Sequence, residues 1–346
     1  MIYLDSAAAS RPLPCAIEAM NMVLRDAWAN SNSVHAAGQR AFSIIEQAKK
    51  TVAQCLGCKP TEVYFVSSAS EAAAIVLKTM QEHTLYKIIS PFEHDAIADA
   101  PENYYGHHYR DKEYGIVQMM VNNETGEIYD IKQTVADHPG DLIATDATAA
   151  AGHIPINFSD LGVDYLFCDA LKFGGVPGCG ILLVKEGAPL SDIMHRPTPP
   201  TALIAACASA LEWSCEEVAP TEVNAWLCGN ALLDEFSHLT NWHINSDTKR
   251  VHNILSIRFD GVENTALAAL LSESGVMVST GAACSSGSDQ PSRVLMASGL
   301  DEQQSRETIR ISFGYENTLE EAHEAARIIV RCVGLLRSIG ADKEGE

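Results

Sequence analysis

One lysine stands between an apolar run and a glycine-rich turn. Residues 164–171 are mostly apolar, Lys172 follows them, and residues 173–180 are rich in glycine. Upstream, the apolar run 142–145 ends in Asp146. A pyridoxal 5′-phosphate (PLP) enzyme needs these two groups, an amine to form a Schiff base and a carboxylate to keep the pyridinium nitrogen protonated. Taken singly, they are also compatible with a surface lysine after a strand and an aspartate that begins a turn.

A short polar segment, residues 67–71, lies between a predicted strand and a predicted helix. Backbone N–H groups at the start of a helix have no intrahelical partner, and together with the helix dipole they bind anions. Ser70 adds a hydroxyl to this segment. The alternative interpretation is an ordinary N-cap.

Two further polar loops follow predicted strands. His94 comes shortly after the strand that ends at Ser90, where an imidazole can stack on a ring or move protons. Asn123 lies in the loop 121–126 and can donate a hydrogen bond to a ring oxygen. The alternatives are a polar loop histidine and a turn built from asparagine and glycine.

Two residues in the last quarter of the chain could act on a substrate. Cys284 lies among the small residues 278–287, and a thiol on a mobile loop can approach a substrate and withdraw. Arg310 lies in a strand-like run, and its guanidinium can hold a carboxylate through two parallel hydrogen bonds. The alternatives are an incidental cysteine in a turn and an exposed charge on a strand.

The other nine cysteines are irregularly spaced, and most lie in apolar or helical segments. With no basic and apolar leader at the N-terminus, we expect free thiols in a cytoplasmic protein. Cys55 and Cys58 form a single CxxC pair without a second pair or a histidine cluster nearby. We therefore expect no metal site.

Composition narrows the class of protein. The 346 residues are 47% hydrophobic and 20% charged, which is ordinary for a globular chain of one or two domains. The formal net charge of −21 is spread along the chain and repels phosphate backbones. No apolar stretch reaches the roughly 20 residues that span a bilayer. We expect neither nucleic acid nor a membrane as a partner.

The elements that must position these residues alternate along the first two thirds of the chain. Strand-like runs separated by helices or loops predict an α/β domain with a mostly parallel sheet covered on both faces. The predicted strands are 62–66, 87–90, 117–121, 142–145, 165–168 and 180–184, and the clearest helices are 14–29 and 41–56. From about residue 206 the pattern changes to a smaller α+β domain. Its predicted elements are helices 206–217, 265–274 and 319–336, and strands 254–259 and 310–313.

Taken in order, these segments resemble the cysteine desulfurases of the class V aminotransferase superfamily, the NifS/IscS-like enzymes, over nearly the whole chain. The resemblance also includes residues 2–5, similar to the family's opening strand, and residues 30–38, similar to its N-x-x-S-x-H-x-x-G segment. It implies a PLP-dependent transferase of fold type I, with a mostly parallel seven-stranded sheet in the large domain. The implied domains are 13–205, which binds PLP, and 1–12 with 206–346, which carries the catalytic cysteine loop.

The resemblance also assigns roles to single residues. It makes Lys172, Cys284 and His94 catalytic, as the Schiff-base lysine, the persulfide-forming cysteine and the histidine that stacks on the cofactor. The implied cofactor-binding residues are Ala69, Ser70, His94, Asn123, Asp146, Asp169, Lys172 and Thr198, the last of which reaches the phosphate of the other subunit. The implied substrate-binding residues are Arg310, Asn123 and Asn32.

Three residues depart from the family pattern. Ala149 replaces a glutamine three residues after the aspartate, and Asp169 and Leu171 replace a serine and a histidine that serve the phosphate. A carboxylate about 4 Å from a phosphate costs on the order of 4 kcal/mol per like-charge pair at an effective dielectric constant of about 20. We therefore expect Asp169 to turn away, to be protonated or to be joined by a cation, for which Arg196 from the other subunit is the candidate.

The implied function is a homodimeric, cytoplasmic PLP-dependent cysteine desulfurase. It would convert L-cysteine to L-alanine, leave a persulfide on Cys284 and pass the sulfur to an acceptor protein. Three alternatives stay open. One is a selenocysteine lyase or another class V PLP enzyme, the second is a non-catalytic desulfurase-like protein, and the third is a structural α/β protein.

Overall fold

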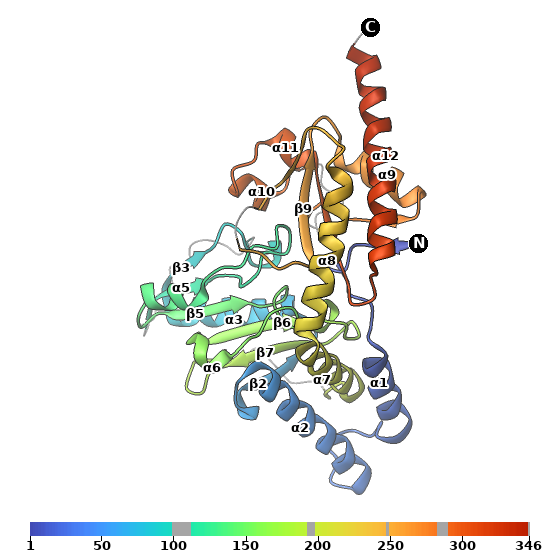
Figure 1. Ribbon diagram of the computed structural model, residues 1–346. Coiled ribbons are helices and arrows are strands. Elements are labelled where there is room, and N and C mark those ends of the chain that lie inside the picture. The colour runs from blue at the N-terminus through green and yellow to red at the C-terminus, as the bar shows by residue number, and fades with distance from the viewer. Residues whose placement is uncertain (99–111, 192–197, 247–248, 282–289, 345–346) are drawn as a thin grey trace. The chain divides into compact units, whose positions relative to one another are not determined.

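The computed structural model describes residues 1–98, 112–191, 198–246, 249–281 and 290–344 (Figure 1). These residues form two compact units. The larger unit comprises Ser10–Val121 and Tyr129–Val218. The smaller unit comprises Met1–Ala9, Asn122–Ile128 and Ala219–Glu346.

The larger unit is built on a mixed sheet in the order β2-β7-β6-β5-β4-β3. The strands are β2 (Val63–Val66), β3 (Thr84–Ile89), β4 (Lys112–Val117), β5 (Leu142–Asp146), β6 (Tyr165–Asp169) and β7 (Gly180–Val184). β3, β4, β5 and β6 are parallel to one another, and β7 is antiparallel to both of its neighbours, β6 and β2. The predicted mostly parallel α/β sheet is confirmed, with six strands in the described part of the chain where the family resemblance implied seven.

Helices of the larger unit pack on this sheet and on each other. They are α1 (Pro14–Asp26), α2 (Ala36–Leu56), α3 (Ala69–His83), α4 (Asp95–Ala98), α5 (Ile131–Asp137), α6 (Phe158–Leu161) and α7 (Thr201–Glu216), with 3₁₀ turns η1 (Pro60–Glu62) and η2 (Ala170–Lys172). The apolar face of α3, which includes Ala72, Val76 and Met80, packs against buried strand residues such as Phe167 and Leu182. α1 and α2 pack on α7.

One predicted strand is displaced in the structure. The apolar run 117–121 suggested a strand there, but β4 ends at Val117 and begins at Lys112. After Val117 the backbone still donates to carbonyls of β5, from Gln118 to Ala144 and from Met120 to Asp146. β4 begins with the charged residues Lys112 and Glu113, so the apolar pattern of the sequence did not reveal where the strand starts.

The smaller unit holds a three-stranded antiparallel sheet in the order β11-β9-β8 and a parallel pair of β1 with β10. Its strands are β1 (Ile2–Tyr3), β8 (Trp242–Ile244), β9 (Ile254–Phe259), β10 (Val276–Met277) and β11 (Thr308–Ser312). Its helices are α8 (Val218–Phe236), α9 (Asn264–Glu273), α10 (Arg293–Ala297), α11 (Glu302–Arg306) and α12 (Leu319–Glu344). The core contains Phe236, Phe259 and Ile309, and the ring of Phe236 meets those of Phe259 and Trp242 edge to face.

The units do not divide where the change of sequence pattern suggested. The expected division at 205/206 lies inside α7, which is one continuous helix of the larger unit. Asn122–Ile128, a polar segment in the middle of the chain, belongs to the smaller unit. Among the described residues, no helix is both long enough and apolar enough to cross a membrane.

Candidate active site

The predicted cofactor residues follow strands that point in the same direction. Because β7 is antiparallel to both β2 and β6, β2 runs parallel to β3, β5 and β6. The carboxyl ends of these four strands therefore lie at one edge of the sheet, where ligands of α/β proteins usually bind. This edge carries the segment 67–71 after β2, His94 after β3, Asp146 at the end of β5, and Asp169 with Lys172 after β6.

Asp146 is a buried carboxylate whose side chain is held in place. It is 7% exposed, and one oxygen accepts a hydrogen bond from the Thr148 N–H at 2.8 Å. Burial raises the pKa of Asp146, while hydrogen bonding by Thr148 and the nearby side chains of His94 and Lys172 act in the opposite direction. A cation placed against this carboxylate would remove much of the cost of its burial. The structure thus brings His94 and Lys172 within electrostatic reach of Asp146.

Lys172 lies at the end of η2, and its backbone is fixed from two sides. Its carbonyl accepts hydrogen bonds from the Ser10 hydroxyl at 2.7 Å and from His153 Nε2 at 3.1 Å. Burial lowers the pKa of His153, so this ring is neutral and donates through Nε2. Ser10 and His153 were missed in the sequence, because neither lies in a motif and both reach Lys172 only through the fold.

His94 is half-buried and has a defined ring orientation. Its Nδ1 accepts a hydrogen bond from the Ala96 N–H at 3.2 Å, so the proton of the neutral ring is on Nε2. The neighbouring Glu93 is fully buried and accepts a hydrogen bond from the Met119 N–H. This anchors the loop that carries His94.

The first turn of α3, the predicted phosphate site, is already hydrogen-bonded to side chains of the protein. Asp169 Oδ2 accepts from the Ala69 N–H at 3.1 Å, and Glu71 Oε2 accepts from the Ser67 N–H at 2.6 Å. The Ser68 hydroxyl caps the helix by accepting from the Glu71 N–H. Ser70 is exposed and offers its hydroxyl. The lysine and aspartate thus suit PLP, whereas the phosphate end has a competing carboxylate.

Asp169 does not turn away, which was one of the three expected solutions. Its second oxygen accepts from the Leu171 N–H at 3.0 Å, so the carboxylate joins the turn of Lys172 to the start of α3. Leu171 and Ala149 are half-buried, and neither side chain can donate a hydrogen bond. Arg196, the candidate cation, lies outside the described residues.

In the smaller unit, Arg310 lies on β11 and is only 2% exposed, so the alternative of an exposed strand charge is wrong. Its Nη1 donates to the Asn123 carbonyl at 2.8 Å, and its Nη2 pairs with Asp5 Oδ1 at 2.9 Å. Among the described atoms, Arg310 Nε and Asn123 Oδ1 are buried without a hydrogen-bond partner. Unsatisfied buried groups of this kind suit a polar ligand. The role of Asp5 was not apparent in the sequence.

The remaining predicted residues are less defined. Asn32 is exposed in a turn in which its N–H donates to Asn30 Oδ1. Gly38, in α2 of the same segment, lies so close to the backbone of Ser33 that any side chain would collide with it. Thr198 is exposed, and Cys284 lies outside the described residues.

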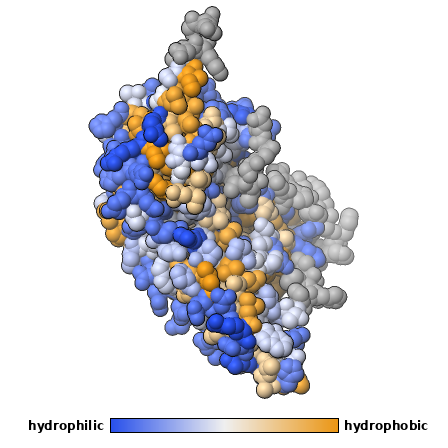
Figure 2. Space-filling view, turned by 90° about the vertical axis from the view of Figure 1, so that its right-hand side faces the viewer, coloured by the Kyte–Doolittle hydropathy of each residue, from blue (hydrophilic) through white to orange (hydrophobic). Residues whose placement is uncertain are grey.

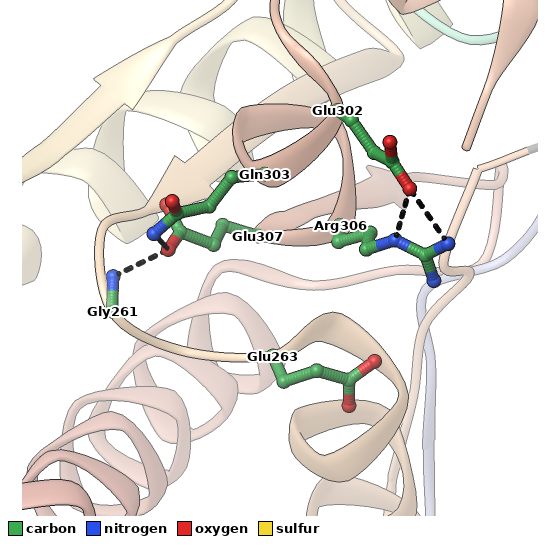
Figure 3. A pocket seen from close by; sticks show the side chains of 6 residues that line it. All are labelled: Gly261, Glu263, Glu302, Gln303, Arg306 and Glu307. Carbon is green, nitrogen blue, oxygen red and sulfur yellow. Dashed lines mark hydrogen bonds and ion pairs between the residues drawn. The ribbon is translucent and has the colours of Figure 1, made fainter.

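Two cavities described in the structure do not contain Lys172 or Asp146. One, of about 800 Å³, lies in the larger unit between α2, β2 and α3 and reaches Ser67 and Glu71. The other, of about 540 Å³, lies in the smaller unit (Figure 3). There Glu302 is paired with Arg306, and Glu307 accepts from the Gly261 N–H and from Gln303. Most of its polar groups are thus already satisfied.

The fold is that of an α/β protein with charged side chains at one edge of its sheet, and comparison with known proteins identifies its family. Residues 2–103, 106–195 and 191–324 match the aminotransferase class-V family. A cysteine desulfurase of Frankia sp. is 30% identical over 98% of this chain and 93% of its own. Cysteine desulfurase IscS of Methanosarcina thermophila is 26% identical over 98% of this chain and 93% of its own. A solved structure of a NifS-like protein is 27% identical, with a TM-score of 0.86 over 96% of this chain and 99% of its own.

The chain therefore belongs to the aminotransferase class-V family and, within it, to the NifS/IscS-type cysteine desulfurases. The family predicted from the sequence is confirmed.

Proposed function

We propose that this protein binds PLP at Lys172 and transfers the sulfur of L-cysteine to Cys284, releasing L-alanine. The observation that carries the proposal is the buried carboxylate of Asp146 within electrostatic reach of Lys172 and His94, at the carboxyl edge of a mostly parallel sheet. The family relatives, which are named cysteine desulfurases, support the choice of substrate.

When bound, PLP supplies an aldehyde that reacts with amines and a ring that accepts electrons. Lys172 would hold the aldehyde end and, once released, its amine would take the α-proton of the substrate. Asp146 would accept a hydrogen bond from the ring nitrogen and keep it protonated. His94 would stack on the ring and move a proton to or from the substrate thiol through Nε2, because its Nδ1 accepts a hydrogen bond from the Ala96 N–H.

In the smaller unit, Arg310 would hold the substrate carboxylate, and its Nε–H is the donor that has no partner among the described atoms. The Cys284 thiolate would attack the substrate sulfur as the C–S bond breaks. The reaction is balanced, because L-cysteine and one thiol give L-alanine and one persulfide. The terminal sulfur would then pass to an acceptor protein.

We further propose a homodimer. Figure 2 shows that hydrophobic residues reach the surface in several places on the face drawn. In the larger unit, Trp28 is 77% and Val34 93% exposed, on the chain that follows α1. A second copy of the chain packed against these side chains would remove their apolar surface from water. Thr198 is exposed as well, as a residue that serves a partner subunit would be.

The decisive test is covalent attachment of PLP. The purified protein incubated with PLP should absorb in the visible range, and borohydride should fix the cofactor to a peptide that contains Lys172. Lys172→Ala should abolish this label. Lys185→Ala, which removes a half-exposed lysine paired with Asp164, should retain it. Equal labelling of wild type and Lys172→Ala would contradict the proposal.

A further inference from the structure

We propose that Asp169 is an internal competitor for the phosphate group of the cofactor, and that the phosphate must displace its carboxylate from the start of α3. This inference rests on the proposed function, because it concerns the same cofactor site. It makes Asp169 a determinant of the affinity for PLP.

The geometry that supports the inference is set by the register of the sheet. Gly180, the first residue of β7, is aligned with Val66 of β2 on one side and with Asp169 of β6 on the other. A Cβ atom on Gly180 would lie 2.6 Å from the backbone carbon of Ser68. The missing side chain thus lets the first turn of α3 pass over the end of β7 and reach Asp169.

The carboxylate of Asp169 takes a donor that an anion at this helix would use. It accepts from the Ala69 N–H at 3.1 Å, and the Leu171 N–H holds its other oxygen at 3.0 Å. A phosphate brought to the same N–H meets the carboxylate of Asp169.

Few donors remain for the phosphate at this turn. The Ser67 N–H is bonded to Glu71, and the Glu71 N–H to the Ser68 hydroxyl. Ser70 supplies the remaining hydroxyl of the first turn. We therefore infer that the phosphate group adds less to cofactor affinity here than it would if residue 169 were neutral.

The experiment compares PLP with pyridoxal, which carries the same aldehyde without the phosphate. Dissociation constants for both are measured by equilibrium dialysis with wild type, Asp169→Asn and Asp169→Ser. We expect the ratio of the pyridoxal constant to the PLP constant to rise at least about tenfold in both variants, because one like-charge contact is removed. The affinity for pyridoxal should be unchanged within about threefold.

Asp137→Asn is the matched control, because it neutralises an exposed carboxylate of the larger unit on α5, outside the first turn of α3. We expect it to change the ratio by less than about threefold. An unchanged ratio in both Asp169 variants would overturn the inference, as would an equal rise in Asp137→Asn, which would indicate a general effect of charge. Labelling of Lys172 by borohydride in the same samples tests the proposed function separately. If PLP still labels Lys172 while the ratio is unchanged, only the role of Asp169 is wrong.

Discussion

At the scale of single residues, the site depends on a carboxylate kept away from water. Asp146 ends a strand whose residues are all buried, and its pKa is raised by that burial. An acid in this position destabilises the folded chain unless a cation compensates it. The proposed cofactor provides a cationic ring nitrogen, so binding and stability are coupled at this residue.

We predict that Asp146→Asn stabilises the protein without PLP at pH 7. The Asp146 carboxyl has a higher pKa in the folded chain than in the unfolded chain, so it binds its proton more tightly when the chain is folded. The free energy of unfolding therefore decreases as the pH rises above the ordinary value of 3.8. Each pKa unit of the rise corresponds to about 1.4 kcal/mol. The advantage of the variant should therefore shrink as the pH falls towards 3.8.

Thermal unfolding of wild type and Asp146→Asn, measured between neutral and acid pH with and without PLP, checks this prediction. Added PLP should reverse the order of stability, because only the carboxylate can pair with a charged ring nitrogen. A variant less stable than wild type at neutral pH without PLP would show that the burial of Asp146 carries no net cost.

At the scale of elements, the contact between β7 and α3 decides the shape of the predicted phosphate site. Gly180 of β7 is aligned with Val66 of β2 and with Asp169 of β6. The backbone of Ser68, the N-cap residue of α3, lies where a side chain of residue 180 would be. Because the close atoms are backbone, relief requires movement of the start of α3 itself.

We predict that Gly180→Ala lowers the free energy of unfolding by about 1–3 kcal/mol, as overpacking of a filled site does. It should also weaken PLP binding, since the N–H donors at the start of α3 would shift.

Gly334→Ala on α12 is the control. No atom lies within 4 Å of a Cβ at that position, so it should stabilise the helix by up to about 1 kcal/mol. Denaturant unfolding of both variants measures the difference. If Gly180→Ala and wild type were equally stable, the start of α3 would move to accommodate the added methyl group at no cost in the free energy of unfolding.

At the scale of the whole molecule, the net charge of −21 favours solubility and opposes self-association, so a dimer must bury apolar surface to offset repulsion. Trp28 and Val34 expose such surface in the larger unit, and Trp226 does so on α8 with 49% exposure. Tryptophan is a frequent energetic centre of interfaces.

We predict that Trp28→Glu raises the dimer dissociation constant at least about tenfold, while the unfolding of the monomer changes little because the side chain is mostly exposed. Light scattering coupled to size exclusion measures the oligomeric state over a range of concentrations. Trp226→Glu is the comparison. Dissociation by this variant alone would place the interface on the smaller unit instead.

The sequence by itself determined the class of fold. Apolar runs that alternate with helices specify parallel strands, and polar residues at or just past the strand ends mark the edge where a ligand can bind, so Asp146, His94 and Lys172 could be placed at that edge. Their proposed roles toward a cofactor came from the ordered set of motifs and not from any single local pattern. Local pattern also located β5, β6, β7 and β9 closely.

Only the tertiary structure decided what these residues touch. That Ser10 and His153 hold Lys172, that Asp5 pairs with Arg310, and that Asp169 occupies a donor of α3 depend on contacts between residues far apart in the chain. Strand register and the close approach permitted by one glycine set these contacts, and neither leaves a periodic signal in the sequence. The place of Asn122–Ile128 in the smaller unit is hidden for the same reason, because a short polar loop shows no pattern that tells which core it joins.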